Sequence, residues 1–210
     1  MKLSSRLQAV ATLVDMNKRV IDVGCDHAYL SICLTLNNNN KVIATDINQN
    51  ALDIAKKNIK RFNLTKRIET KLTSGLTDID VKSEDNIVIC GLGTHTILKI
   101  LNSNKLSNTL IISSNNNVEK LREEVIKMGY YIDSELFIID NKKPYIIIKF
   151  LKGYKKYSRN DILYGPILRD NKAYKNYIIK KNRLILKRIP RKKIVLRLKQ
   201  KTLIKKLTMI

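Results

Sequence analysis

Residues 19–30 read as a short buried strand that breaks at a glycine between acidic residues and then becomes a helix. The strand is rich in β-branched residues, yet Asp22 places a carboxylate where a buried parallel strand normally carries another apolar side chain. Gly24 follows and permits either a positive φ angle or the close approach of a ligand. Because helical apolar spacing resumes over 28–34, the stretch predicts the first strand, turn and helix of an open α/β sheet, with a ligand at the turn.

The same turn discriminates between nucleotide cofactors. Asp26 and His27 occupy positions where the dinucleotide fingerprint G-x-G-x-x-G requires glycines, which disfavours a nicotinamide- or flavin-dependent oxidoreductase. S-adenosylmethionine (SAM) has no pyrophosphate to bind, and the D-x-G turn resembles the first motif of class I SAM-dependent methyltransferases. Asp46 lies 22 residues after Gly24, the spacing at which an acid on the second strand binds ribose hydroxyls. Without Asp46, the turn would equally suit an ordinary strand-to-helix connection.

Up to residue 152 the chain alternates between strand and helix patterns. Strands are expected at 20–23, 42–45, 68–72, 86–90, 109–113, 130–139 and 144–151, and helices at 4–14, 28–34, 49–62, 97–101 and 118–128. This alternation, closed by two neighbouring strands, predicts a mostly parallel sheet whose last strand is antiparallel. The first helix is expected to lie across the sheet edge and to leave Arg6 free.

Two further turns are candidate walls of the ligand site. The small polar residues 73–76 follow the third expected strand and suit an adenine ring. The glycine-containing segment 91–94 follows the fourth strand and leaves two interpretations open. It either lines the active site or makes a tight connection in which Thr94 caps the next helix.

Positive charge is concentrated in the last part of the chain. The formal net charge is +23, and residues 151–210 hold 20 of the 41 basic residues but only two of the 18 acidic ones. A segment this basic predicts a polyanionic partner, either nucleic acid or an anionic membrane surface. A merely solubilising surface and a compositional drift towards Lys, Asn and Ile are the alternatives, but drift does not explain why the acids avoid this segment.

We therefore expect two domains, at 1–152 and at 153–210. In the second, one helical pattern covers 171–189, and another begins at Ile194 after Pro190 interrupts the first. Together they predict an antiparallel helical hairpin with an apolar seam and basic outer faces.

Cysteine usage and hydropathy indicate the compartment. The three cysteines, Cys25, Cys33 and Cys90, fit no C-x-x-C pattern, so neither a disulfide framework nor a metal site is expected. No run approaches the roughly 18 apolar residues of a membrane span. We expect a soluble, cytoplasmic and monomeric protein without a metal or a membrane partner.

These motifs together resemble the bacterial tRNA (adenine(22)-N(1))-methyltransferase family, known as TrmK. The string D-x-G-x-D-H-A-Y-L at 22–30 is far more specific than a bare D-x-G, and the likeness extends to 2–7, 90–94, 164–166 and the helical tail. The resemblance implies a Rossmann-like class I methyltransferase domain followed by a C-terminal α-helical hairpin that docks tRNA. It also implies methyl transfer from SAM to N1 of adenine 22 in tRNA, which gives 1-methyladenosine.

The resemblance and the motifs assign three groups of site residues. The expected cofactor-binding residues are Asp22, Gly24, Asp26, His27, Asp46, Ile47, Ser74, Gly75, Leu76, Gly91, Leu92 and Gly93. The expected catalytic residues are Asp26, His27, Tyr29 and Asn115. The expected RNA-binding residues are Arg6, Lys180, Lys181, Arg183, Lys187, Arg188, Arg191, Lys192, Lys193 and Arg197.

Adenine N1 carries an in-plane lone pair, so its methylation needs positioning and water exclusion rather than a strong base. N1 is reachable only when the nucleotide is unpaired or flipped. Asp26 would favour the cationic product ring, and Asp26 or His27 would accept the proton that the exocyclic amine later loses. His27 is otherwise a histidine hydrogen-bonded within the turn, and Tyr29 either stacks on the base or packs on the sheet. Enzymes that methylate the exocyclic amine usually carry Asn or Asp, two prolines and an aromatic after strand four, so Cys90–Gly93 favours the ring nitrogen.

Three positions depart from the family pattern. Cys25 stands where serine is usual, and Thr94 replaces the second of two adjacent glycines. Ser113-Ser114-Asn115 stands where Gln-Pro-Asn is typical and keeps only the asparagine. The last two changes bear on the target-base pocket, so a catalytically inactive RNA-binding protein that retains the fold is the alternative function.

Overall fold

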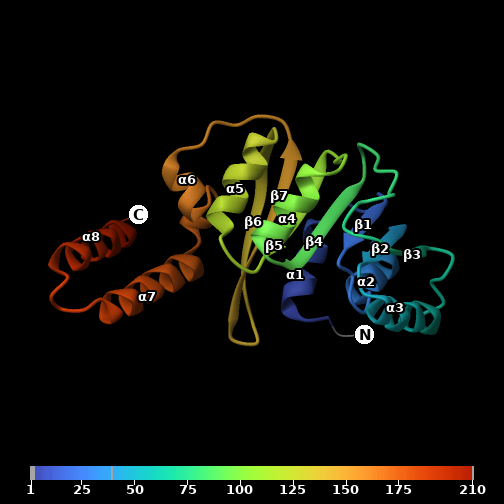
Figure 1. The fold of residues 1–210 in the computed structure, drawn as a ribbon, viewed down its shortest axis with the longest axis horizontal. Helices are drawn as coiled ribbons and strands as arrows, with labels where there is room; N and C mark the ends of the chain where they lie inside the picture. The colour runs from blue at the N-terminus through green and yellow to red at the C-terminus, as the bar shows by residue number, and fades with distance from the viewer. Residues whose placement is uncertain (1–2, 39, 210) are drawn as a thin grey trace. The chain divides into compact units, whose positions relative to one another are not determined.

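The computed structural model describes residues 3–38 and 40–209, so residues 1, 2, 39 and 210 lie outside the description. The chain divides into two compact units, one ending at Lys156 and the other starting at Tyr157 (Figure 1). The N-terminal unit contains all strands of the described residues, and the C-terminal unit is helical.

The N-terminal unit is built on a seven-stranded sheet. Its strands are β1 (Val20–Val23), β2 (Val42–Asp46), β3 (Ile68–Leu72), β4 (Asn86–Leu92), β5 (Thr109–Ser114), β6 (Tyr130–Asp140) and β7 (Lys143–Lys152). They lie in the order β3-β2-β1-β4-β5-β7-β6. The first five pair in parallel, whereas β7 is antiparallel to β5 and to β6. The predicted mostly parallel sheet with an antiparallel last strand is confirmed.

Two groups of helices accompany this sheet. The helices are α1 (Ser5–Leu13), α2 (Tyr29–Asn37), α3 (Gln49–Arg61), α4 (Thr94–Asn102) and α5 (Val118–Lys127). The first three contact one another in sequence, and α4 contacts α5; Figure 1 shows these last two lying together across the neighbouring strands. The core of the first group joins Val10, Ile32 and Ala55 to Val20 and Val88 of the sheet. Because strand side chains alternate between faces, Asp22 shares this face with Val20 and lies beneath α2.

Side-chain capping and a left-handed residue set the bounds of α3, the helix that leads the chain away from the end of β2 at the pocket. The Asn48 side chain accepts from the backbone N–H groups of Asn50 and Ala51 and so caps the first turn. Leu52, Ala55 and Ile59 follow at helical spacing and are buried. The helix ends where Asn63 adopts a left-handed conformation, which asparagine tolerates better than most residues.

The C-terminal unit contains α6 (Arg159–Tyr164), a short 3₁₀ turn η1 (Leu168–Asp170), α7 (Lys172–Arg188) and α8 (Ile194–Met209). Gln200 of α8 donates to the carbonyl of Asn182, and Arg197 donates to that of Ile189. Sequence numbers therefore rise along one helix as they fall along the other. The predicted antiparallel hairpin is confirmed.

The prediction of an apolar seam between α7 and α8 is wrong for the half of the hairpin next to the loop that connects the two helices. Tyr174 and Leu207 are buried at the other end, but the Leu198 side chain is 57% exposed. The helices instead meet there through polar contacts, such as Gln200 Nε2 to Asn182 Oδ1 at 2.8 Å. Because a side-chain amide occupies the interface, apolar residues of α8 are left facing solvent. Within the described residues, no helix is both long and apolar enough to cross a bilayer.

A buried ion pair joins α5 to β6 in the N-terminal unit. Arg122 Nε lies 2.8 Å from Glu135 Oε1, and both side chains are almost completely buried. We expect Glu135→Leu to lower the free energy of unfolding by about 3–5 kcal/mol, because it leaves a guanidinium buried without this carboxylate. The double variant Arg122→Met/Glu135→Leu should recover most of that loss in urea unfolding followed by circular dichroism. Equal losses in the single and double variants would contradict this account.

Candidate active site

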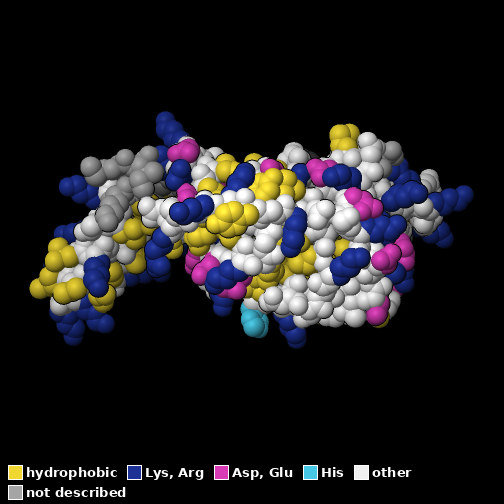
Figure 2. Space-filling view, turned by 90° about the horizontal axis from the view of Figure 1, so that it is seen from above, with side chains coloured by type: hydrophobic (Ala, Val, Ile, Leu, Met, Phe, Trp, Pro, Cys, Tyr) yellow, Lys and Arg dark blue, Asp and Glu magenta, His cyan; other side chains and the backbone are white. Residues whose placement is uncertain are grey.

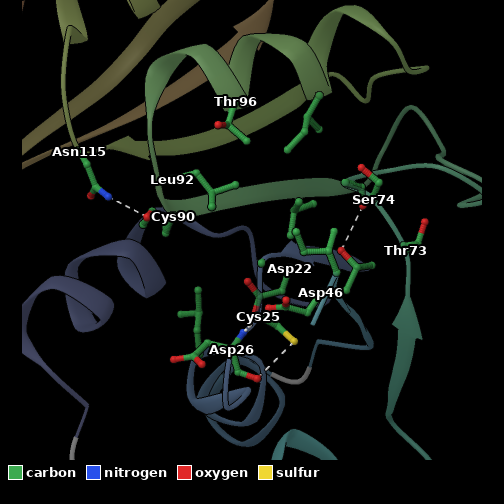
Figure 3. A pocket seen from close by; sticks show the side chains of 18 of the residues that line it. Asp22, Cys25, Asp26, Asp46, Thr73, Ser74, Cys90, Leu92, Thr96 and Asn115 are labelled. Atoms are coloured by element: carbon green, nitrogen blue, oxygen red, sulfur yellow. Dashed lines mark hydrogen bonds between the residues drawn. The ribbon is translucent and has the colours of Figure 1, made fainter. Parts of the chain in front are cut away.

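A pocket of about 790 Å³ opens at the carboxyl ends of β1, β2 and β4. Its walls also include one face of α4, Arg6 and Leu7 of α1, and Tyr145 of β7. Figure 3 shows Asp22, Asp26 and Asp46 gathered on one side, with Asn115 and Ser74 at opposite ends. The pocket thus lies at the sheet edge where open α/β proteins bind their ligands.

The turn after β1 forms the floor of the pocket and is attached to β2. The N–H groups of Gly24 and Cys25 both donate to the carbonyl of Thr45, at 2.8 and 2.9 Å. Gly24 has φ +72°, the first of the two reasons for a glycine that the sequence left open. Asp26 and Ala28 also adopt positive φ angles, at a cost of roughly 1–2 kcal/mol per residue. The attachment to β2 therefore has to hold a strained backbone in place.

Three carboxylates face this floor in an otherwise basic protein. Asp46 Oδ2 accepts from the N–H of Asp26 at 3.1 Å, and Asp46 Oδ1 accepts from the N–H of Asn48 at 2.9 Å. Asp22 is only 3% exposed and accepts from Ser31 Oγ at 2.6 Å. Burial raises the pKa of the Asp22 carboxyl to about 6, a shift that the Ser31 hydrogen bond opposes and the Asp46 charge reinforces. Carboxylates held this way favour a cationic ligand.

Among the described residues, no group of three or more His, Cys, Asp or Glu side chains is placed to hold a metal ion. Two thiols also lie on the pocket wall. Burial and the charge of Asp22 raise the pKa of Cys90 to about 12, and burial raises the pKa of Cys25 as well, so the thiol forms predominate at neutral pH.

His27 and Tyr29 lie on the lip of the pocket, beside Asp26. His27 Nε2 is 3.4 Å from Asp26 Oδ1, and the His27 carbonyl accepts from Asn58 of α3. The Tyr29 ring is 42% exposed and meets the imidazole edge-on at 6.0 Å between centroids. The imidazole and the phenol ring are thus both accessible from the pocket, as a catalytic role requires.

Arg6 is not free, which corrects our expectation. Its guanidinium carbon lies 4.9 Å from the centroid of the Tyr145 ring, a cation–π contact, and its side chain lines the pocket. The reason is that α1 packs against β6 and β7 rather than only against the sheet edge. Nearby, Asn115 Nδ2 donates to the carbonyl of Gly91 at 2.7 Å. A cation, an aromatic ring and an amide therefore also belong to the pocket wall.

Thr94 does not cap α4 through its side chain, contrary to one of the two interpretations. Gly93 is the N-cap, and the Thr94 hydroxyl contacts Ser114 Oγ at 2.8 Å and donates to the carbonyl of Asn116 at 2.6 Å. The two departures from the family pattern thus contact each other and join the start of α4 to the end of β5. Neither residue lines the pocket, whereas Asn115 does.

Most sequence-predicted residues of the N-terminal unit line this one pocket, but not all do. Leu76 is buried and, like Gly93, is absent from the wall, whereas the other ten expected cofactor-binding residues and all four expected catalytic residues are part of it. Wall residues outside the predicted site include Thr45, Thr77, Thr96, Lys99, Ile100, Ser103, Asn104 and Tyr145, together with neighbours of the predicted motifs. Three of these, Thr96, Lys99 and Ile100, share one face of α4 at spacings of three and four residues. The sequence pattern indicated only the glycine turn before this helix, and not the helix itself, as a candidate wall.

In the C-terminal unit, the eight expected RNA-binding residues from Lys180 to Lys193 are exposed. Figure 2 shows Lys and Arg side chains on the hairpin, at the left, beside exposed apolar side chains. Arg197 differs, because its half-buried Nη1 donates to the carbonyls of Leu186 and Ile189. The Arg197 guanidinium therefore caps the C-terminal carbonyls of α7 in addition to carrying a positive charge.

The chain is similar in sequence and in structure to known methyltransferases. Residues 3–148 match the methyltransferase domain family. The chain is 30% identical over 183 residues, covering 82% of this chain and 77% of the relative, to the tRNA (adenine(22)-N(1))-methyltransferase of Bacillus subtilis. It resembles the structure of Mycoplasma capricolum TrmK in complex with S-adenosylhomocysteine, with a TM-score of 0.84, 34% identity, and coverage of 100% and 97% of the two chains. A putative tRNA (m1A22) methyltransferase of Streptococcus pneumoniae in complex with SAM gives a TM-score of 0.86 at 28% identity, covering 98% and 99%.

The titration of Asp22 predicts how cofactor affinity depends on pH. Below a pKa of about 6 the carboxyl gains a proton, so a cationic cofactor loses its charged neighbour as the pH falls. We expect the SAM affinity to drop about tenfold between pH 7.5 and pH 5, measured by calorimetry. Asp22→Asn should bind SAM more weakly at pH 7.5 and show little change over this range. A variant that retains the full pH dependence would assign it to another group.

Proposed function

Because the chain belongs to the family of tRNA (adenine(22)-N(1))-methyltransferases, we propose that it transfers a methyl group from SAM to N1 of adenine 22 in tRNA. The observation that carries the proposal is the division of the pocket. Asp22, Asp26 and Asp46 face its floor, while Arg6 and Lys99 line it elsewhere. The floor suits a cationic cofactor, and the cations suit a polyanionic acceptor.

The residues present fit SAM. Asp46 lies where an acid binds ribose hydroxyls, the small residues 73–77 leave space for an adenine ring, and Asp22 offers a buried carboxylate to positive charge. When bound, SAM supplies a methyl group carried on a positively charged sulfur. The chain's own contribution is to hold the acceptor ring in line with that group and to keep water out.

The acceptor side of the pocket supplies the orientation. Asn115 uses its amide N–H for the Gly91 carbonyl, which leaves its amide oxygen to accept from the exocyclic amine of adenine. The N1 lone pair would then form the new N–C bond without prior loss of a proton, while the bond between the methyl carbon and the cofactor sulfur breaks and its electron pair stays on sulfur, which leaves as the neutral thioether. The product ring is cationic, and Asp26 stabilises it until His27 or Asp26 accepts a proton from the exocyclic amine. Tyr29 is exposed at the lip, so we expect its ring to contact the base as it enters the pocket.

A tRNA substrate assigns the protein to the cytoplasm, and the three free cysteines suit its reducing conditions. Hydrogen bonds within the hairpin leave its exposed lysines and arginines for phosphate contacts, which carry affinity rather than sequence specificity. We infer a monomer, with the basic unit presenting tRNA to the pocket.

The direct test is methyl transfer to an unmodified tRNA transcript. With labelled SAM, we expect close to one methyl group per tRNA, identified as 1-methyladenosine at position 22 by mass spectrometry of digested nucleosides. A transcript with adenine 22 replaced by guanine should accept none. Tight binding of SAM and tRNA without any transfer would instead support an inactive RNA-binding protein.

Charge reversal on the hairpin tests its role in docking. We expect replacement of Lys180, Arg183, Lys187 and Lys192 by Glu to weaken tRNA binding by at least tenfold at moderate salt and to flatten its salt dependence. The SAM dissociation constant should not change.

The matched control reverses four exposed lysines of the N-terminal unit. These are Lys18, Lys41, Lys66 and Lys82, which come just before strands β1, β2, β3 and β4 and so lie at the edge of the sheet opposite the pocket. The control should bind tRNA within about threefold of the parent protein. An equal loss in both variants would mean that net charge alone, and not the hairpin surface, governs binding.

A further inference from the structure

A second groove begins where the active-site pocket ends. It has a volume of about 640 Å³ and is lined by Leu3, Ser4, Leu7, Tyr29, Asn58, Arg61 and Phe62. Leu7 and Tyr29 also line the pocket itself, so the two cavities share a wall. If an RNA strand places one nucleotide in the pocket, the nucleotide before or after it can therefore reach the groove across this shared wall.

The groove combines an aromatic and apolar surface with one cation. Phe62 is half-buried, Tyr29 is exposed, and Leu3 is buried. Arg61 is exposed, and no described carboxylate or carbonyl pairs with it. Aromatic rings beside an arginine are the combination that binds single-stranded nucleic acid, because bases stack on the rings and the cation meets a phosphate.

The groove is also joined to the catalytic turn. Asn58, one helical turn before Arg61 on α3, donates to the His27 carbonyl at 3.0 Å. An occupant of the groove therefore lies against the same helix that supports His27. The groove is thus a continuation of the active site and not a separate cavity.

We propose that this groove binds the nucleotide next to the target adenosine, with its base against Tyr29 and Phe62 and its phosphate at Arg61; this rests on the proposed function. Adenine 22 has to leave the base stack to reach the pocket, which deprives its neighbour of a stacking partner. The aromatic wall replaces that partner, and Arg61 fixes the backbone. The groove thereby stabilises the flipped state of the RNA.

The test compares Arg61→Ala with Lys60→Ala. Lys60 is exposed and adjacent on the last turn of α3, but it does not line the groove, so both variants lose the same charge at the same helix end. We expect Arg61→Ala to weaken tRNA binding at least fivefold in filter-binding assays without cofactor, and Lys60→Ala to weaken it less than twofold. Both variants should keep the parent SAM dissociation constant in calorimetry.

A modified substrate locates the contact. A synthetic tRNA carries one neutral methylphosphonate on either side of adenosine 22. One of the two substitutions should weaken binding of the parent protein about as much as Arg61→Ala does, and should cost the Arg61→Ala variant nothing further. Additive losses at both positions, or equal losses for Arg61→Ala and Lys60→Ala, would overturn the proposal. If the parent protein leaves adenosine 22 of unmodified tRNA unmethylated, the proposed function fails, and this inference fails with it.

Discussion

The attachment of the first turn to β2 supports the rest of the site. Two N–H groups of the turn share the Thr45 carbonyl, and Asp46 accepts the N–H of Asp26. These bonds hold left-handed residues that would otherwise relax, and they do so from a strand whose position is fixed by parallel pairing on both sides. Asp46 is therefore both a proposed cofactor ligand and part of the frame that shapes the turn, so the two roles cannot be separated by a single substitution.

Electrostatics divides the pocket in a way that suits two ligands of opposite charge. Because the pKa of Asp22 is raised above its usual value in the folded protein, its ionised form at neutral pH opposes folding, and this penalty disappears as the pH falls from about 6 towards 4. A cation on the floor of the pocket offsets that penalty. Arg6 adds a positive charge to the wall of the same pocket, where its guanidinium lies against the Tyr145 ring.

The sequence was sufficient for the sheet, the acidic turn and the hairpin, because each depends on local patterns: β-branched runs, a glycine at positive φ, and a proline between two helices. It was insufficient where distant segments meet. Tyr145 reached the pocket only through antiparallel pairing of β7 with β5, and Arg6 met it only because α1 packs on β6 and β7. Likewise, the apolar residues of α8 predicted a seam, but Gln200 reaching Asn182 displaced them from the interface. Such outcomes depend on tertiary contacts that no periodicity encodes.

The contact between Thr94 and Ser114 has a consequence for the history of the protein. Both hydroxyls also donate to the Asn116 carbonyl, at 2.6 and 2.9 Å. Either hydroxyl therefore has a hydrogen-bond acceptor even when the other is absent. Once one was present, the other gained a second partner within hydrogen-bonding distance. Positions 94 and 114 should accordingly covary among relatives, with paired hydroxyls in some lineages and neither in others.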